Sequence, residues 1–236
     1  MIVKRKTALN IRKAHRYLGI FIGIQFIMWT VSGMYFSWTD LDEIHGDHFK
    51  KEVVENPSFS NLEGPGTMFS HIPVSSLELK DIGGKAFYLV NGEILVNPET
   101  GEEKQGISRE EALKIAKKHM REDLEVSGIK LLDETGDHHE YRGGALPAYV
   151  ISYKNPADLK AYISVNDAAF KSVRHRDWRW FDFLWMTHTM DYEGRDDFNN
   201  LVLRIFSLMG LITVLSGFVL WYISSPSIRK IQKRFK

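Results

Sequence analysis

Two long apolar segments, one near each end of the chain, dominate the pattern of hydrophobic and polar positions. Residues 17–38 contain no charged side chain, and residues 201–223 contain only Arg204, near their start. A helix rises about 1.5 Å per residue, so each segment reaches roughly 33 Å and can cross the hydrocarbon core of a bilayer. Aromatic residues lie at the ends of both segments, as is typical of the membrane–water interface. The pattern therefore predicts two transmembrane helices.

The region between these segments, residues 39–200, alternates in the way that short strands do. Residues 85–105 predict a hairpin closed by Asn91-Gly92, the pair favoured in type I′ turns. Ser108 and Glu111 form a capping box at the start of a helix predicted over residues 108–120. The remaining strand predictions are 126–133, 148–154, 161–165 and 169–175. The predicted fold class is α+β, an antiparallel sheet with one main helix, inserted between two transmembrane helices.

This middle region also contains a weak internal repeat. Residues 93–103 (EILVNPETGEE) and residues 161–172 (AYISVNDAAFKS) share an alternating strand, a Val-Asn pair, a tight turn and a second strand. The repeat predicts two copies of a small antiparallel unit, the first of which lacks its helix.

The charges are segregated along the chain, and this predicts an orientation. Residues 1–16 hold six Lys/Arg and residues 224–236 hold five, whereas all 30 acidic residues lie within residues 39–200. The positive-inside rule therefore places both termini in the cytoplasm and residues 39–200 outside, in the periplasm if the membrane is a bacterial inner membrane. The first span exceeds the usual signal-peptide hydrophobic region and lacks an A-x-A-like cleavage site, which favours a retained helix. Basic residues at the chain ends, not on one folded face, argue against nucleic-acid binding.

Small residues line one face of each predicted span, which is typical of helix–helix contacts. The expected packing residues are Gly19, Gly23, Gly33, Ser207, Gly210 and Gly217. Gly19 and Gly23 form a GxxxG pair, and His15 falls on the same arc at 100° per residue. We therefore expect His15 to point toward a partner helix and not toward lipid.

Several motifs together resemble the PepSY-associated transmembrane family. Residues 14–36 (AHRYLGIFIGIQFIMWTVSGMYF) are similar to its opening H-R-[WY]-L-G helix with a Ser/Thr-Gly pair. Residues 187–222 are similar to its later helix, which follows a histidine and ends in [ST]-G-x-x-x-W, and residues 39–200 resemble a PepSY domain. Larger members have four or more spans and act as haem-bearing reductases of ferric siderophores. This chain departs from them in keeping two spans and in having Thr189 where the family often has arginine.

The resemblance makes His15, His188, His45 and His48 candidate ligands of haem b. By the predicted topology His15 lies near the cytoplasmic face and His188 near the outer face, roughly 30 Å away, so they cannot share one haem. Each then needs a second imidazole from a symmetry mate or another subunit, and His188 has the further alternative of pairing with His45 or His48. Without haem, His15 is an anchor among the headgroups.

Three other segments carry candidate chemistry. His45, Asp47 and His48 supply nitrogen and oxygen donors that suit iron or zinc, although such an acidic run is also typical of a solvated helix end. Residues 138–140 lie among glycines and predict an exposed loop. Residues 176–190 are rich in aromatic side chains and predict either a helix on the outer membrane surface or a segment that closes the soluble core.

Two functions of different classes follow from these observations. The first is a component of a haem-dependent electron-transfer system, a homodimer or one subunit of a larger membrane complex, that reduces periplasmic ferric chelates for iron acquisition. The alternative is a non-enzymatic membrane module whose periplasmic PepSY domain binds and regulates or scaffolds a protein partner. The chain lacks hydrolase signatures such as G-x-S-x-G, H-E-x-x-H and the P-loop. It also lacks cysteine, which excludes iron–sulfur clusters and thiolate zinc sites.

Overall fold

The computed structural model describes residues 5–55, 57–60, 62, 64, 69 and 73–226. The chain divides into two compact units, one formed by Met1–Trp38 with Asp182–Lys236 and the other by Thr39–Phe181. Most of the basic C-terminal tail and the first four residues lie outside the described residues. The predicted arrangement of an α+β domain between two membrane-spanning helices is confirmed.

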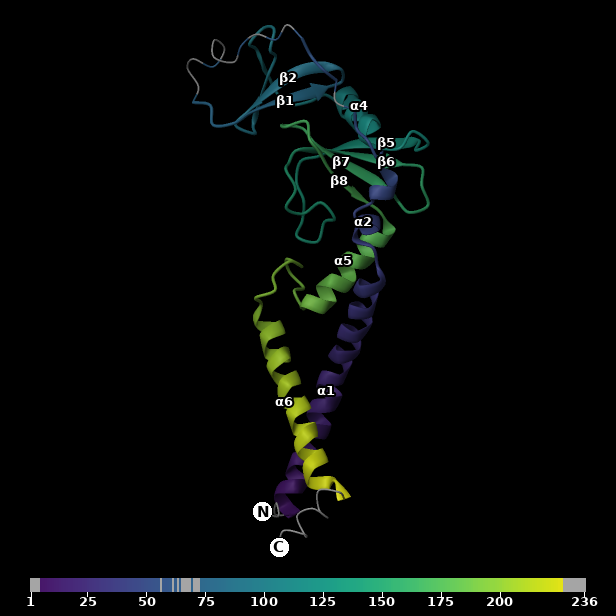
Figure 1. The fold of residues 1–236 in the computed structure, drawn as a ribbon, viewed down its shortest axis with the longest axis vertical. Helices are drawn as coiled ribbons and strands as arrows, with labels where there is room; N and C mark the ends of the chain where they lie inside the picture. The colour runs from purple at the N-terminus through teal and green to yellow at the C-terminus, as the bar shows by residue number, and fades with distance from the viewer. Residues whose placement is uncertain are drawn as a thin grey trace. The chain divides into compact units, whose positions relative to one another are not determined.

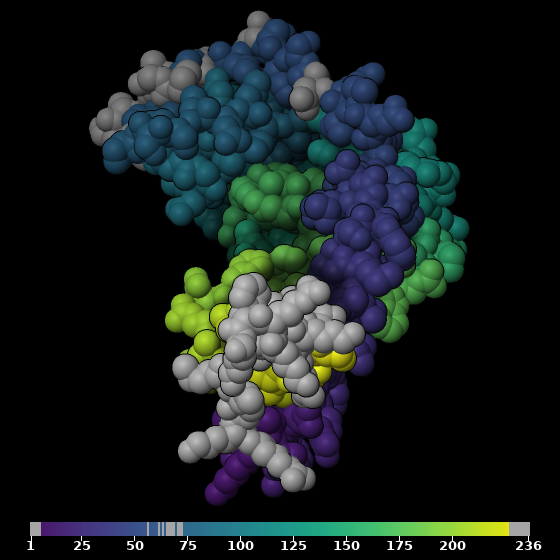
Figure 2. Space-filling model, turned by 60° about the horizontal axis from the view of Figure 1, so that its bottom comes forward, coloured from purple at the N-terminus to yellow at the C-terminus, as the bar shows by residue number. Residues whose placement is uncertain are grey.

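The helical unit is built on two long helices, α1 (Arg5–Trp38) and α6 (Leu201–Ser224). Among the described residues, both are long and apolar enough to cross a membrane. The two helices pack against each other, and their surfaces lie side by side in the space-filling view, α1 in purple and α6 in yellow (Figure 2). Most of their large apolar side chains are exposed, including Ile24 at 71% and Phe218 at 65%. Side chains of this kind are suited to lipid and not to water.

The helix α5 (Arg176–Thr189) ends against α1, and polar side chains of α1 satisfy its last carbonyls. Gln25 Nε2 donates to the carbonyl of Thr187 at 3.1 Å, and Trp29 Nε1 donates to the carbonyl of His188 at 2.8 Å. A helix leaves its last four carbonyls without intrahelical partners, so these two bonds cap the end of α5. The requirement explains why Gln25, a polar residue within an apolar helix, is buried.

The small residues of the two spans behave differently. On α6, a Cβ at Gly210 would lie 3.1 Å from Phe26 Cζ, so this glycine lets α1 approach closely. On α1, a Cβ at Gly19, Gly23 or Gly33 would meet no described atom within 4 Å. The α1 glycines therefore do not form the contact with α6, and Ser207 on α6 is exposed. What covers the α1 glycine face is a neighbouring helix or lipid.

We predict that Gly23→Leu weakens association between chains, because the leucine side chain would separate helix backbones that the GxxxG pair brings together. The expected loss is on the order of 1 kcal/mol of association free energy. Analytical ultracentrifugation in detergent measures it, with Ile24→Leu as a control at an exposed neighbouring position. Unchanged association of the Gly23→Leu variant would assign this face to lipid.

The second unit contains two four-stranded antiparallel sheets, each with its strands in sequential order (Figure 1). The first sheet consists of β1 (Leu77–Ile82), β2 (Lys85–Val90), β3 (Ile94–Val96) and β4 (Glu103–Lys104). The second consists of β5 (Val126–Leu132), β6 (Ala148–Tyr153), β7 (Lys160–Ser164) and β8 (Phe170–Arg174). The helix α4 (Arg109–His119) connects them, and two short helices, α2 (Leu41–Ile44) and η1 (Asp47–Phe49), open the unit.

The predicted repeat corresponds to this pair of sheets. The two repeated segments, residues 93–103 and 161–172, lie in the β3–β4 and β7–β8 hairpins, which are the third and fourth strands of their respective sheets. The turn at Asn91-Gly92 has positive φ at both residues, as a type I′ turn requires, and Glu93 N donates to the carbonyl of Val90. The four strand predictions in the second sheet are confirmed to within one residue at each end.

One hydrophobic core joins both sheets to α4. The capping box of α4 is confirmed, since the Ser108 amide donates to Glu111 Oε2 at 2.7 Å and the Glu111 amide donates to Ser108 Oγ. From this start, Ala112 and Ile115 turn one helix face inward against apolar residues of both sheets. Burial of this face, more than helix propensity, stabilises so short a helix.

Candidate functional site

The side chain of His15 on α1 contacts the Ser216-Gly217 pair on α6. His15 Nδ1 lies 2.7 Å from Ser216 Oγ, and Ser216 Oγ donates to the carbonyl of Thr213 at 2.7 Å. A Cβ at Gly217 would lie 3.4 Å from His15 Cε1. A Cβ at Gly217 would therefore make an ordinary van der Waals contact with the imidazole ring, which lies close to α6 at this point.

The side chain of His188, at the end of α5, makes the same type of contact with α1. His188 Nδ1 lies 2.7 Å from Ser32 Oγ, and Ser32 Oγ donates to the carbonyl of Met28 at 2.6 Å. The ring of Phe36 meets the His188 ring edge to face, with the centroids 5.6 Å apart. Burial lowers the pKa of the His188 imidazole, which favours its neutral form.

These contacts determine which ring nitrogen carries the proton in both histidines. A serine hydroxyl has one hydrogen, and a backbone carbonyl can only accept. Since Ser32 and Ser216 each donate to a carbonyl of their own helix, each hydroxyl oxygen accepts from the histidine Nδ1–H. In the neutral imidazole the lone pair is then on Nε2, which has no hydrogen-bond partner within the described part of the chain. In its neutral form each ring thus leaves Nε2 as the nitrogen with the free lone pair.

The two histidines belong to separate sites. His15 and Ser32, the partner of His188, lie 17 positions apart on α1, which corresponds to about 26 Å along the helix. An iron bound by two imidazoles needs both within a few ångströms, so His15 and His188 cannot bind the same ion. The arrangement is one imidazole near each end of the long helix.

A haem fits these donors. Its iron takes an imidazole nitrogen as an axial ligand, and a ligating histidine characteristically donates its other ring N–H to a neighbouring acceptor. Both features are present at His15 and at His188. At the His15 end, Arg12 is exposed and donates to Ser224 Oγ at 3.2 Å, so a cation lies one helical turn from His15, and it would pair with the carboxylates of a haem bound there.

The residues predicted as a metal site are not brought together. Asp47 pairs with Lys50 at 2.5 Å, His45 caps the end of α2, and His48 packs against Phe49 with ring centroids 3.9 Å apart. Among the described residues, no group of three or more His, Asp or Glu side chains is placed to hold a metal ion. The acidic run therefore forms a short capped helix and a turn, the alternative that the sequence left open.

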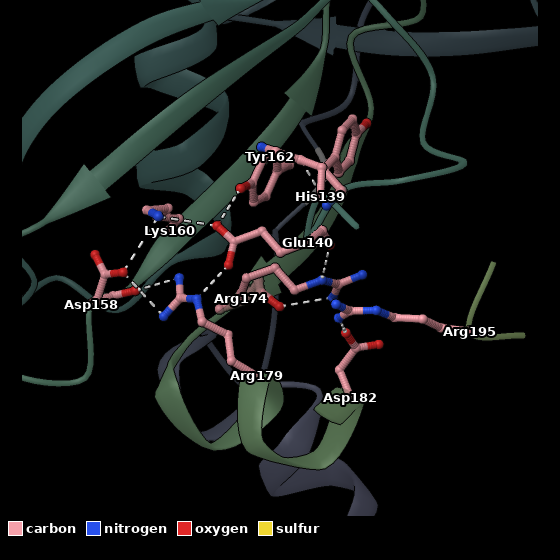
Figure 3. A network of polar contacts seen from close by, with 11 residues as sticks. His139, Glu140, Asp158, Lys160, Tyr162, Arg174, Arg179, Asp182 and Arg195 are labelled. Atoms are coloured by element: carbon pink, nitrogen blue, oxygen red, sulfur yellow. Dashed lines mark hydrogen bonds and ion pairs between the residues drawn. The ribbon is translucent and has the colours of Figure 1, made fainter. Parts of the chain in front are cut away.

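The sequence predicts an exposed loop at residues 138–140, and this prediction is wrong for Glu140, which is not exposed. Its carboxylate accepts from Tyr162 Oη at 2.6 Å, Arg179 Nε at 2.6 Å and Lys160 Nζ at 3.1 Å (Figure 3). The Glu140 side chain is only 11% exposed. Burial alone would raise the pKa of Glu140, but hydrogen bonds from Arg179 and Tyr162 and nearby positive charges outweigh it and hold the pKa low. Three side-chain donors to one buried carboxylate tie the 133–147 loop to the second sheet and to the start of α5.

The aromatic segment 176–190 is the helix α5. Its Trp185 ring packs edge to face against Phe36 and Phe198, with centroids 5.7 and 5.3 Å apart, whereas Trp180 is 57% exposed. Asp182, at 7% side-chain exposure, pairs with Arg195 at 2.5 Å and so fixes the loop that follows the helix (Figure 3). The location of this helix on a membrane surface stays a prediction.

Comparison with known proteins points to the same architecture. A family model described as the PepSY-associated TM region matches residues 2–223, which is nearly the whole chain. No curated protein and no solved structure matches.

Proposed function

Since the chain belongs to the family of PepSY-associated transmembrane regions, we propose that it holds haem b at His15 and His188 and conducts electrons across a bacterial inner membrane. The electrons would reduce ferric chelates in the periplasm, as one step of iron acquisition. The observation that carries the proposal is the pair of matching His–Ser contacts. They present one imidazole Nε2 near each end of α1, where two separate carriers are needed to cover the thickness of a membrane.

The chain itself supplies ligands, orientation and an apolar environment. Each serine keeps a histidine in one tautomer, and Phe36 packs against the His188 ring. Bound haem supplies an iron that accepts and returns one electron at a time. Each site has one histidine from α1 or α5, so a second axial imidazole at His15 would come from another copy of the chain or another subunit. At His188 it would come from the same sources or from His45 or His48. This requirement supports a homodimer or a larger membrane complex.

The experiment that tests the function is the visible spectrum of the full-length protein, purified from membranes of cells grown with ample haem. Haem with two histidine ligands gives a Soret band and sharp α and β bands on reduction. Reoxidation of the reduced protein by a ferric chelate then tests electron delivery. If the protein carries no haem when all its partners are present, the electron-transfer function is wrong. The partner-binding role of the domain would then be the remaining candidate.

We predict that Ser32→Ala and Ser216→Ala each weaken haem binding at one site about 10–100-fold, because the histidine loses the acceptor that fixes its tautomer. Haem titration followed at the Soret band measures the affinity. Replacement of the same serines by threonine keeps a hydroxyl and should restore part of the affinity. Ser37→Ala is a matched control, since Ser37 Oγ also donates to a carbonyl of its own helix, that of Met34, but no histidine contact is described for it.

The charge segregation predicts that both termini are cytoplasmic and that residues 39–200 are periplasmic. A fluorescent reporter that folds only in the cytoplasm should be active when fused after Lys236. An alkaline phosphatase, which is active only in the periplasm, should be inactive at that position. An active phosphatase fusion would show that the orientation is the opposite of the predicted one. The proposed direction of electron flow would then be reversed as well.

A further inference from the structure

The strand β5 forms one edge of the second sheet. The sheet has the order β5-β6-β7-β8, and within the described part of the chain β5 pairs with β6 alone. This pairing has a bulge between Val126 and Gly128 and is regular from Gly128 to Leu132. An edge strand presents a row of backbone amide and carbonyl groups with which another extended chain can pair.

The other three edges of the two sheets are protected against such pairing. Three of the six residues of β1 are charged, and one of them, Asp81, pairs with Lys118 on α4 at 2.8 Å. The strand β4 has only two residues. At β8, the turn at Gly46 lies so close that a Cβ on it would come within 2.8 Å of Val173 Cγ1. Charge, short length and a covering segment are common ways of protecting a sheet edge.

The regular part of β5 has little of this protection. Lys130 is the only charged residue among the seven of the strand, and Leu131 is 50% exposed. Side chains alternate along a strand, so Leu131 is on the same face as Ile129, which packs against the core. A Cβ at Gly128 would meet no described atom within 4 Å, so nothing there hinders a second backbone. This edge is therefore suited to the addition of a strand.

The charges at the two ends of β5 indicate the kind of partner. The acidic residues before the strand are each paired with a cation, in the pairs Glu122–Lys51, Asp123–Arg121 and Glu125–Lys154. Directly after the strand, Asp133 and Glu134 are exposed, and no ion pair with a described residue is found for either. Every strand pair in both sheets is antiparallel, and an antiparallel strand added to β5 would begin beside its end. Basic residues at the start of that strand would complement the two acids.

We propose that β5 is the docking edge for an extended segment of a partner protein. The segment adds to the second sheet as an antiparallel strand, begins with Lys or Arg beside Asp133 and Glu134, and continues with alternating apolar residues that cover Leu131. The inference does not rest on the proposed electron transfer, because β5 contains no candidate haem ligand.

The test measures binding of a fluorescein-labelled peptide, Lys-Arg-Thr-Val-Glu-Val-Thr, to the full-length protein by fluorescence anisotropy. In the proposed register its valines lie opposite Leu131 and Ile129, and its glutamate lies opposite Lys130. Leu131→Lys should weaken binding about tenfold, since it removes the apolar contact and adds a charge to the edge. Leu79→Lys is the matched control, because Leu79 is 47% exposed on the edge strand β1, and it should bind the peptide as the wild type does.

A second comparison tests the charges. Asp133→Asn combined with Glu134→Gln should weaken binding several-fold and should reduce its dependence on salt. Asp123→Asn combined with Glu122→Gln removes the same number of charges before the strand and should have little effect. A peptide with Lys-Arg moved to its other end, Thr-Val-Glu-Val-Thr-Lys-Arg, should bind more weakly than the first peptide.

Several results would overturn the inference. It is wrong if the wild type does not bind the first peptide at millimolar concentration, or if Leu131→Lys and Leu79→Lys bind it equally well. Equal or tighter binding of the second peptide would exclude the antiparallel direction. If Leu131→Lys separates copies of the chain in analytical ultracentrifugation, the occupant of the edge is a second copy and not a partner protein. Since Leu131→Lys should keep the haem content and melting temperature of the wild type, its loss of peptide binding is distinguishable from failure of the proposed function.

Discussion

Replacing His15 or His188 by alanine is expected to remove about half of the bound haem in each case, and replacing both is expected to remove all of it. The reason is that the two imidazoles lie about 26 Å apart along α1, so each serves a different site. Haem per chain, measured from the reduced spectrum of the purified variants, gives the result. Transfer of electrons to an external ferric chelate should be lost almost completely in either single variant, because both carriers are needed to cross the bilayer.

His119→Ala provides the matched control for these variants. His119 lies at the end of α4 in the soluble unit, where its ring stacks on Phe170 with centroids 4.7 Å apart. Its loss removes an imidazole of similar burial without touching either candidate site, so the haem content should stay at the wild-type level. If His15→Ala and His188→Ala each removed all of the bound haem, the two histidines would serve one site. Such a site would have to combine His15 of one copy of the chain with His188 of another copy. Loss of none would exclude both as ligands.

The secondary structure could be predicted from the sequence because its signals are local. The capping box of α4, the Asn91-Gly92 turn and the alternating strands of the second sheet involve residues close to one another in the chain, and all are confirmed. The two apolar helices are equally local, since length and composition identify them.

The partners of the histidines could not be predicted in this way. Ser216 is 201 positions from His15, and Ser32 is 156 positions from His188. In the sequence analysis Gly33 and Gly217 are predicted packing residues, because small residues on a span are typical of helix contacts, and the serines before them appear only within the motifs of the family resemblance. The role of the hydroxyl as the acceptor of a histidine proton becomes visible only when the helices are placed together. Two serines before glycine, each on a span and each matched by a histidine near a helix end, are the signal that was available.

The glycine face of α1 shows a second limit. An arc of small residues identifies a face that allows close approach. It does not show whether the neighbouring helix packs against that face or against another face of the same helix. In the folded chain, α1 packs through Ile22, Gln25 and Ser32, and not through Gly19 and Gly23. Gln25 lies on this face because its side chain caps α5. That contact joins residues far apart in the chain, so the local sequence pattern does not predict it.

Glu140→Gln is expected to destabilise the soluble unit by about 2–3 kcal/mol, since the charged acceptor of three side-chain donors is lost while Arg179 and Lys160 keep their charges. For a unit of this size the melting temperature should fall by roughly 4–10 °C. Glu125→Gln is the control, because the Glu125–Lys154 pair is 69% and 60% exposed and is expected to contribute about 0–1 kcal/mol. Circular dichroism of the full-length variants follows the unfolding of the sheets.

The effect of Glu140→Gln should also depend on pH in a definite direction. Glu140 has a folded-state pKa below its usual 4.5, so the stability that its ionisation contributes is complete above pH 4.5 and is lost as the pH falls through the folded-state pKa. The difference in melting temperature between wild type and Glu140→Gln should therefore be constant from pH 7 to about pH 5 and should shrink below that. A difference that grew on acidification would show that the buried carboxyl is stabilised in its protonated form. The hydrogen bonds from Arg179 and Lys160 would then not be what holds the 133–147 loop in place.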